Sequence, residues 1–121
     1  VYADRIQLKR VIKNLIQNAI SYGEPNFPIE ISIGEIPQYI VIKVKDYGAG
    51  ISQADIDKIF NKYYSAAKKF RKIGTGLGLY LALQIVKGHG GELAVESEEG
   101  KFTEFTIKLP AVMNINLHYG E

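Results

Sequence analysis

Two pairs of strand-like segments, each pair joined by a short turn, limit the possible folds of this 121-residue chain more than any other feature. Apolar residues recur at every second position over 29–33 and again over 40–44, with Pro37 between the two segments. Two more strands are predicted near 91–97 and 102–109. Strands joined so closely pair antiparallel, whereas parallel strands need a long crossover. The pattern therefore argues against a sheet in which strands and helices alternate one by one.

Segments with helical periodicity lie before the first pair of strands and between the two pairs. The side chain of Asp4 can cap a first helix while Gln7 reaches back to complete the cap, and Gly23 offers a left-handed stop. Helices are expected at about 5–22, 53–60 and 77–87. The resulting order predicts an α+β fold: a two-layer sandwich with a mixed, mostly antiparallel sheet of about four to five strands, covered on one face by three helices.

Composition and charge are those of a single globular domain. We expect this domain over residues 1–110 and a weak C-terminal tail over 111–121. The net charge of +2 is too small to favour nucleic acid or an anionic membrane as the main partner. The longest uncharged run, 73–86, has 14 residues, fewer than the roughly 18–20 that a membrane span needs. Because the chain has no cysteine and no signal segment, we expect a soluble, cytoplasmic domain cut from a longer protein.

Asn14 and Asn18 lie one turn apart on the first predicted helix, beside its apolar stripe. Their amide oxygens could converge on one point. A hard cation such as Mg²⁺ binds a few protein oxygens together with substrate phosphates, so such a pair suits a metal site. A solvated polar helix face is the alternative explanation.

Two glycine-rich segments are further candidates. Asp46 follows a strand, and Gly48 and Gly50 would let backbone come close, so the carboxylate can accept a hydrogen bond from an exocyclic amine; an ordinary turn is the alternative. The segment 74–79 opens the third helix with amides that favour phosphate. It is not a Walker P-loop, which would continue with Gly-Lys-Ser or Gly-Lys-Thr. It is not a dinucleotide fingerprint either, because no strand is predicted before it.

A basic segment lies between these candidates. Residues 61–73 show no regular period and no acid, and a segment of this length is often a lid over a ligand. A solvated run of charge is the alternative. Its cations are Lys62, Lys68, Lys69, Arg71 and Lys72.

Taken in this order, four motifs resemble those of one family. Residues 14–19 look like an N box, 46–50 like a G1 box, 59–64 like an F box and 74–79 like a G2 box. These are the boxes of the ATP-binding catalytic domain of sensor histidine kinases, within the gyrase, Hsp90, histidine kinase and MutL superfamily. The resemblance covers residues 1 to about 110 and implies a Bergerat-type fold that binds ATP and Mg²⁺ beneath a mobile lid.

The resemblance also implies roles for individual residues. As the catalytic pair, Asn18 would bind Mg²⁺ and Asn14 would support the metal and phosphate site. Asp46 would accept a hydrogen bond from the adenine amino group, Tyr22 would pack beside the adenine, and Phe60 would anchor the lid. The further residues expected at the nucleotide are Gly48, Gly50, Ile51, Tyr64, Lys68, Lys69, Arg71, Gly74, Thr75, Gly76, Leu77, Gly78 and Thr103.

The sequence departs from the family's motifs at three positions. Ser21 and Ser65 stand where many members carry a cation, and Ile73 replaces the first glycine of the G2 box. Cations of the basic segment could supply the missing charge. The same departures favour a competing hypothesis, a degenerate nucleotide-binding module that regulates without phosphotransfer.

Asn14 separates the possible activities within the superfamily. Members that hydrolyse ATP or phosphorylate serine resemble one another in having Glu at this position, since water or a hydroxyl needs a base and an amide cannot act as one. A neutral imidazole is already a nucleophile, so we expect the γ-phosphoryl group of ATP to pass to a histidine. Neither His89 nor His118 resembles the acceptor motif. The expected partners are a separate dimerisation and acceptor domain of the same kinase and a downstream response regulator, and the isolated domain is expected to be a monomer.

Overall fold

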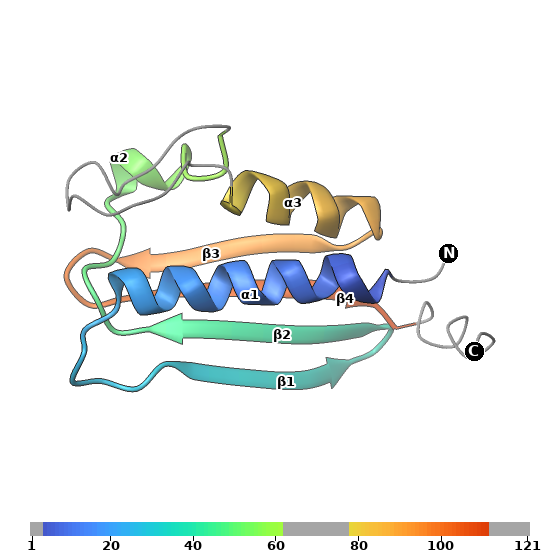
Figure 1. Ribbon diagram of the computed structural model, residues 1–121, viewed down its shortest axis with the longest axis horizontal. Helices are drawn as coiled ribbons and strands as arrows, with labels where there is room; N and C mark the ends of the chain where they lie inside the picture. Colours follow the sequence, from blue (N-terminus) through green and yellow to red (C-terminus); the bar gives the residue numbers. More distant parts are fainter. Residues whose placement is uncertain (1–3, 62–77, 112–121) are drawn as a thin grey trace.

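The computed structural model describes residues 4–61 and 78–111, which form a layer of helices packed on one antiparallel sheet (Figure 1). In chain order the elements are α1 (Arg5–Tyr22), β1 (Glu30–Ile36), β2 (Tyr39–Asp46), α2 (Gln53–Ile56), α3 (Gly78–Gly88), β3 (Glu92–Glu98) and β4 (Phe102–Pro110). The α+β class and the order of elements predicted from the sequence are confirmed.

The sheet has four strands in the order β1-β2-β4-β3, and each neighbouring pair is antiparallel. Both predicted hairpins are present. The first hairpin turns through Pro37 and Gln38. The φ of 73° at Gln38 suits the second central residue of a tight turn whose first central residue is proline. The central pairing, between β2 and β4, joins residues far apart in the sequence and places Asp46 opposite Thr103.

The core lies between the helices and the inner face of the sheet. Along β4 every second residue is buried, and Phe105 and Ile107 are only 2% and 1% exposed. Leu15 of α1 and Val86 of α3 are fully buried in the same cluster. Burying a side chain of this size stabilises the fold by about 1.5–3 kcal/mol relative to leaving it in water. The cluster thereby fixes α1 and α3, and the polar residues they carry, on the sheet.

The outer strand β1 lies beside the helix layer rather than beneath it (Figure 1). Ile31 and Ile33 pair with buried residues of β2 and so project toward the same face, yet they are 49% and 72% exposed. Helix α1 contacts β2, and α3 contacts β3. The predicted helix cover of one face therefore stops short of β1.

The second helix is shorter than predicted. It ends at Ile56 rather than near residue 60, because the chain continues in tight turns, with the Lys58 amide donating to the Asp55 carbonyl at 2.8 Å. These turns allow the consecutive residues Ile59 and Phe60 both to pack against the core. On a helix, neighbouring residues point about 100° apart, so only one of the two would face the core squarely.

Two predictions about the ends of α1 were also wrong. Gly23 is extended, with φ −75° and ψ 164°; glycine is needed there for space, because a Cβ would lie 2.5 Å from the Ala19 carbonyl oxygen. Asp4 caps the first turn as predicted, but Gln7 does not reach back, and its Oε1 is buried without a hydrogen-bond partner. The Asp4 amide instead donates to Nε2 of His89 at 2.9 Å.

Candidate functional site

Polar residues singled out in the sequence gather at one end of the two layers. Helix α1 and strand β2 both end there, beside the turn between β3 and β4 (Figure 1). Helix α3 packs against α1, and the first residue of α3 lies beside the middle of α1. The packing of the core thus brings the N box, the G1 box and the start of α3 to one region.

Asp46 is the last residue of β2 and is only 5% exposed. Its Oδ1 accepts a hydrogen bond from the Gly48 amide at 3.0 Å. Burial raises the pKa of this carboxyl above its ordinary value of 3.8, and the Gly48 hydrogen bond only partly opposes that shift. The described residues place no cation against the carboxylate. Its second oxygen therefore remains available to a ligand that brings a hydrogen-bond donor.

Thr103 faces Asp46 across the sheet and is 6% exposed. Its Oγ1 lies 3.1 Å from Oγ of Ser97, the residue opposite it on β3. Ser97 Oγ donates to the Phe102 carbonyl at 2.6 Å and accepts from the Ile51 amide at 2.8 Å. A row of polar groups therefore crosses three strands at this end of the inner face and reaches the G1 box.

The G1 box rests on the turn between β3 and β4. Gly50 has φ of +71°, and a Cβ at this position would overlap the carbonyl oxygen of Glu98. The amide of Gly100 donates to the Ala49 carbonyl at 2.6 Å. Glycine is thus required at position 50 for two reasons: its positive φ and the close approach of the two backbones.

Asn14 and Asn18 lie on the half-buried side of α1 that adjoins α3. Nδ2 of Asn14 donates to the Gly78 carbonyl at 3.3 Å, which ties the middle of α1 to the first residue of α3. The side chain of Asn18, one turn further on, supplies an amide oxygen. In the described part of the chain no three His, Cys, Asp or Glu side chains cluster as metal ligands. One amide oxygen together with phosphate oxygens nevertheless fits the hard-oxygen coordination of Mg²⁺.

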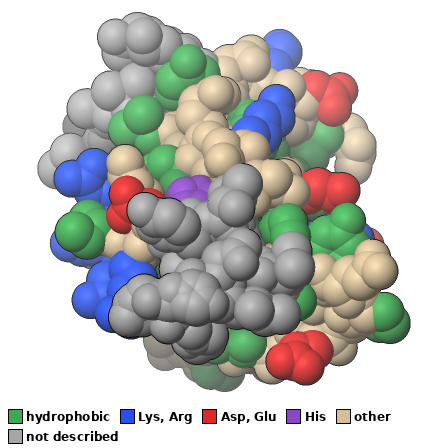
Figure 2. Space-filling model, turned by 90° about the vertical axis from the view of Figure 1, so that its right-hand side faces the viewer, with side chains coloured by type: hydrophobic (Ala, Val, Ile, Leu, Met, Phe, Trp, Pro, Cys, Tyr) green, Lys and Arg blue, Asp and Glu red, His purple; other side chains and the backbone are tan. Residues whose placement is uncertain are grey.

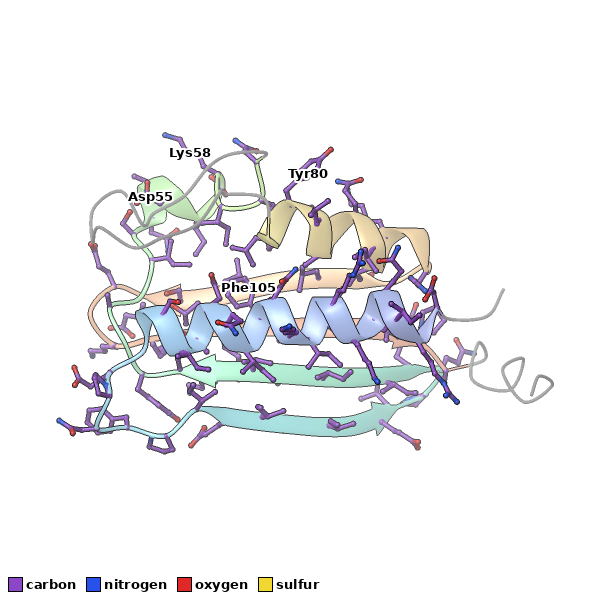
Figure 3. The ribbon with its side chains drawn as sticks, viewed as in Figure 1. Asp55, Lys58, Tyr80 and Phe105 are labelled. Carbon is purple, nitrogen blue, oxygen red and sulfur yellow. The ribbon has the colours of Figure 1, made fainter. Side chains whose placement is uncertain are left out.

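Phe60 is half-buried and packs against the core. Its ring meets that of Phe105 edge-on, with centroids 6.2 Å apart and an interplanar angle of 76°. Figure 3 shows Phe105 projecting from β4, whereas Tyr80 points from α3 away from the sheet. The aromatic contact fixes the chain just before residue 62.

Several predicted site residues lie outside the described residues, and the structure does not place them. These are the side chain of Tyr22, together with Tyr64, Lys68, Lys69, Arg71, Gly74, Thr75, Gly76 and Leu77. The expected lid over 61–73 lies almost wholly outside them as well.

Two residues that contact the predicted site were missed by sequence reasoning. Ser97 is a polar residue on a β3 face that otherwise carries Leu93 and Val95, so strict alternation along β3 could have revealed it. Gly23 lies close to Asp46, since a Cβ on Gly23 would be 3.4 Å from the Cβ of Asp46. No local pattern signals that contact, which depends on how α1 packs over β2.

His89 has a structural place at the opposite end of the molecule. Its Nε2 accepts the Asp4 amide, so the ring proton lies on Nδ1 and is donated to the Ile85 carbonyl at 2.8 Å. The ring thereby joins the start of α1 to the end of α3. Figure 2 views this end, where basic, acidic and apolar side chains are interspersed.

A family model described as "Histidine kinase-, DNA gyrase B-, and HSP90-like ATPase" matches residues 3–113. The chain belongs to this family. Among curated members, the sensor protein SrrB of Staphylococcus aureus is 39% identical over 109 residues, which are 88% of this chain and 19% of SrrB. The chain thus spans about a fifth of the length of that relative.

Solved structures of the same family share this fold. The mycobacterial sensor histidine kinase MprB aligns with a TM-score of 0.79 at 26% identity, over 89% of this chain and 72% of that one. The nucleotide-free catalytic domain of the histidine kinase ThkA aligns with a TM-score of 0.77 at 31% identity, over 89% and 68%. As its four motifs predicted, the chain is an ATP-binding domain of the sensor histidine kinase type. Within the described residues no helix has the length and apolar character needed to cross a membrane.

Proposed function

We propose that this domain binds Mg-ATP and donates the γ-phosphoryl group to a histidine on a separate acceptor domain of the same kinase. The residue that carries the proposal is Asn14, an amide whose Nδ2 is held against the first residue of α3. The resemblance aligns Asn14 with the Glu that serves as general base in members that hydrolyse ATP. An amide cannot remove a proton from water or a hydroxyl. A neutral imidazole nitrogen, in contrast, attacks phosphorus without first losing a proton.

The described residues support specific roles in this reaction. The buried carboxylate of Asp46 would accept from the amino group of adenine, with Thr103 beside it. The amide oxygen of Asn18 would hold Mg²⁺, which supplies charge neutralisation at the phosphates when bound. Asn14 would support the phosphate site from the same helix face. Phe60 would anchor the lid. That the lid cations Lys68, Lys69 and Arg71 contact the phosphates stays a prediction.

The transfer itself needs alignment and neutralised charge more than proton removal. The imidazole nitrogen forms a bond to the γ-phosphorus, and the bond from that phosphorus to the β–γ bridging oxygen breaks. ADP leaves with the bonding electrons, and the imidazole ring loses its proton to solvent. Because this chain is proposed to carry only the donor site, the acceptor histidine must approach from outside it.

The wider assembly follows from the same proposal. The dimerisation and acceptor domain would be the direct partner, and a response regulator would take the phosphoryl group from the histidine. We propose that this domain acts in the cytoplasm as a monomeric unit of a longer kinase, whether or not that kinase is anchored in a membrane.

The competing function is a degenerate module that binds nucleotide but transfers no phosphate, favoured by Ser21 and Ser65 at positions where many members carry cations. Incubation with radiolabelled ATP, Mg²⁺ and the separately produced acceptor domain decides between the two. We expect acid-labile label on the acceptor with wild type and none with Asn18→Ala. Gln17→Ala, which removes an amide from an exposed position of α1, is the matched control and should transfer normally. ATP binding by wild type without labelling of the acceptor would favour the degenerate module.

A further inference from the structure

We infer that Ser97 is a positioning residue for the choice of nucleotide: its hydroxyl group fixes the direction of the Thr103 O–H bond, so that Thr103 meets the base only as an acceptor. The inference rests on the proposed binding of adenine beside Asp46 and Thr103. Ser97 belongs to none of the four sequence motifs.

The hydrogen bonds around Ser97 determine which atom donates. Ser97 has one hydroxyl proton, and the Phe102 carbonyl at 2.6 Å can only accept, so that proton goes to Phe102. The Ile51 amide, at 2.8 Å, donates to Ser97 Oγ. The hydroxyl of Thr103, at 3.1 Å, must then supply its own proton to the contact with Ser97.

This assignment has a consequence for any ligand beside Thr103. With its proton turned toward Ser97, the Thr103 oxygen has only lone pairs left to offer. Asp46, opposite it on the neighbouring strand, is also an acceptor. Two adjacent acceptors match the two N–H hydrogens of an exocyclic amino group, directly or through one water. They oppose the carbonyl oxygen that hypoxanthine and guanine carry at the same place.

Ser97→Ala should therefore weaken the discrimination rather than the fold alone. Without Ser97 Oγ, the Thr103 hydroxyl is free to rotate and to donate to a carbonyl oxygen on the base. Competition titrations with ATP and inosine triphosphate (ITP) on the domain measure this directly. We expect wild type to prefer ATP, and Ser97→Ala to narrow the ATP-to-ITP affinity ratio by roughly 2- to 12-fold, the worth of one neutral hydrogen bond. Part of the change should be tighter binding of ITP, which mere loss of structure would not produce.

Three variants make the test specific. Ser97→Thr keeps the hydroxyl and should keep the wild-type ATP-to-ITP affinity ratio. Thr106→Val removes a hydroxyl from the opposite face of β4 and should leave the ratio unchanged. In a Thr103→Val background, Ser97→Ala should have no further effect on the ratio, because the group through which Ser97 acts is gone.

The outcomes separate this inference from the proposed function. Failure of wild type to bind ATP would overturn both. ATP preference in wild type with an unchanged ratio in Ser97→Ala, or an equal effect of that change with and without the Thr103 hydroxyl, would overturn the inference alone. Where thermal unfolding shows that Ser97→Ala has not folded, Ser97→Cys, which keeps the volume with a weaker donor and acceptor, is titrated instead and should shift the ratio in the same direction.

Discussion

Replacing Asp46 with Asn tests the candidate site more sharply than removing the side chain. In the structure one carboxylate oxygen, Oδ1, accepts the Gly48 amide at 3.0 Å. An amide side chain in the same place has one acceptor atom and one donor group, and the Gly48 N–H selects the oxygen. The NH₂ group then occupies the position of the other carboxylate oxygen, which is the one available to a ligand.

The size of the effect follows from this reversal. The amino group of ATP would meet a donor, and loss of a hydrogen bond to a charged acceptor weakens binding by about 1.5–3 kcal/mol, or roughly 10- to 150-fold. ITP carries a carbonyl oxygen at the same position of its base and would gain a neutral hydrogen bond of about 0.5–1.5 kcal/mol. We therefore expect Asp46→Asn to lose or reverse the preference for ATP.

Competition titrations against a fluorescent ATP analogue measure these affinities on the isolated domain. Wild type is expected to bind ATP at least roughly 5- to 150-fold more tightly than GTP, because an unsatisfied buried polar group costs on the order of 1–3 kcal/mol. Asp46→Ala should weaken ATP and narrow that ratio without reversing it. Asp57→Asn, at an exposed position, is the matched control. An Asp46→Asn variant with wild-type affinity and preference for ATP would refute the placement of the adenine amino group at Asp46.

Three further tests address the metal assignment, the backbone at Gly50 and the pKa of Asp46. Asn18→Ala should abolish Mg²⁺-dependent transfer to the acceptor domain, and Asn18→Asp should also impair it by adding charge beside the phosphates; transfer at the wild-type rate by either would contradict the metal assignment. Gly50→Ala should lower the free energy of unfolding by at least about 1–3 kcal/mol, because the φ of Gly50 is +71° and a Cβ there would meet backbone. Gly34→Ala, where a Cβ meets open space, is the control and should not lower it. Equal melting temperatures for the two variants would contradict this prediction. In the nucleotide-free domain, burial raises the pKa of Asp46, so the native state holds that proton more tightly than the unfolded chain does. Wild type should therefore lose stability relative to Asp46→Asn as the pH rises from 3.8 through the raised native pKa, and a gain over that window in thermal melts would contradict the shift.

Periodicity predicted the architecture of this domain because each element buries one face. The alternation along β2 and the helical spacing along α1 both follow from contact with a single core, so both could be read locally. The same periodicity pointed to the two polar residues at the centre of the candidate site. Asp46 takes a buried position at which the apolar alternation along β2 would be expected to continue, and Asn14 lies beside the apolar stripe of α1.

The features that sequence reasoning missed depend on contacts between distant segments. The Asp4 amide pairs with His89 rather than with Gln7, which requires the end of α3 to lie beside the start of α1. The position of Ser97 beside Thr103 depends on the β3–β4 register, and its bond to Ile51 on the packing of the G1 box. Local propensity cannot rank the His89 contact against a capping box with Gln7, because either one would satisfy the same donor, the Asp4 amide.

The candidate site continues the geometry of the core while changing its chemistry. Along the inner face of β4, the buried positions in the direction of the site are Ile107, then Phe105 and finally Thr103. On β2, Val44 is likewise followed by Asp46. Apolar residues at these two positions would extend the core and would avoid the cost of burying an ionised carboxylate. They would offer no acceptor to a base. The apolar residues next to the polar row, Val44 and Phe105, are only 1% and 2% exposed. Such close packing favours acceptors that a ligand can satisfy without first having to order them.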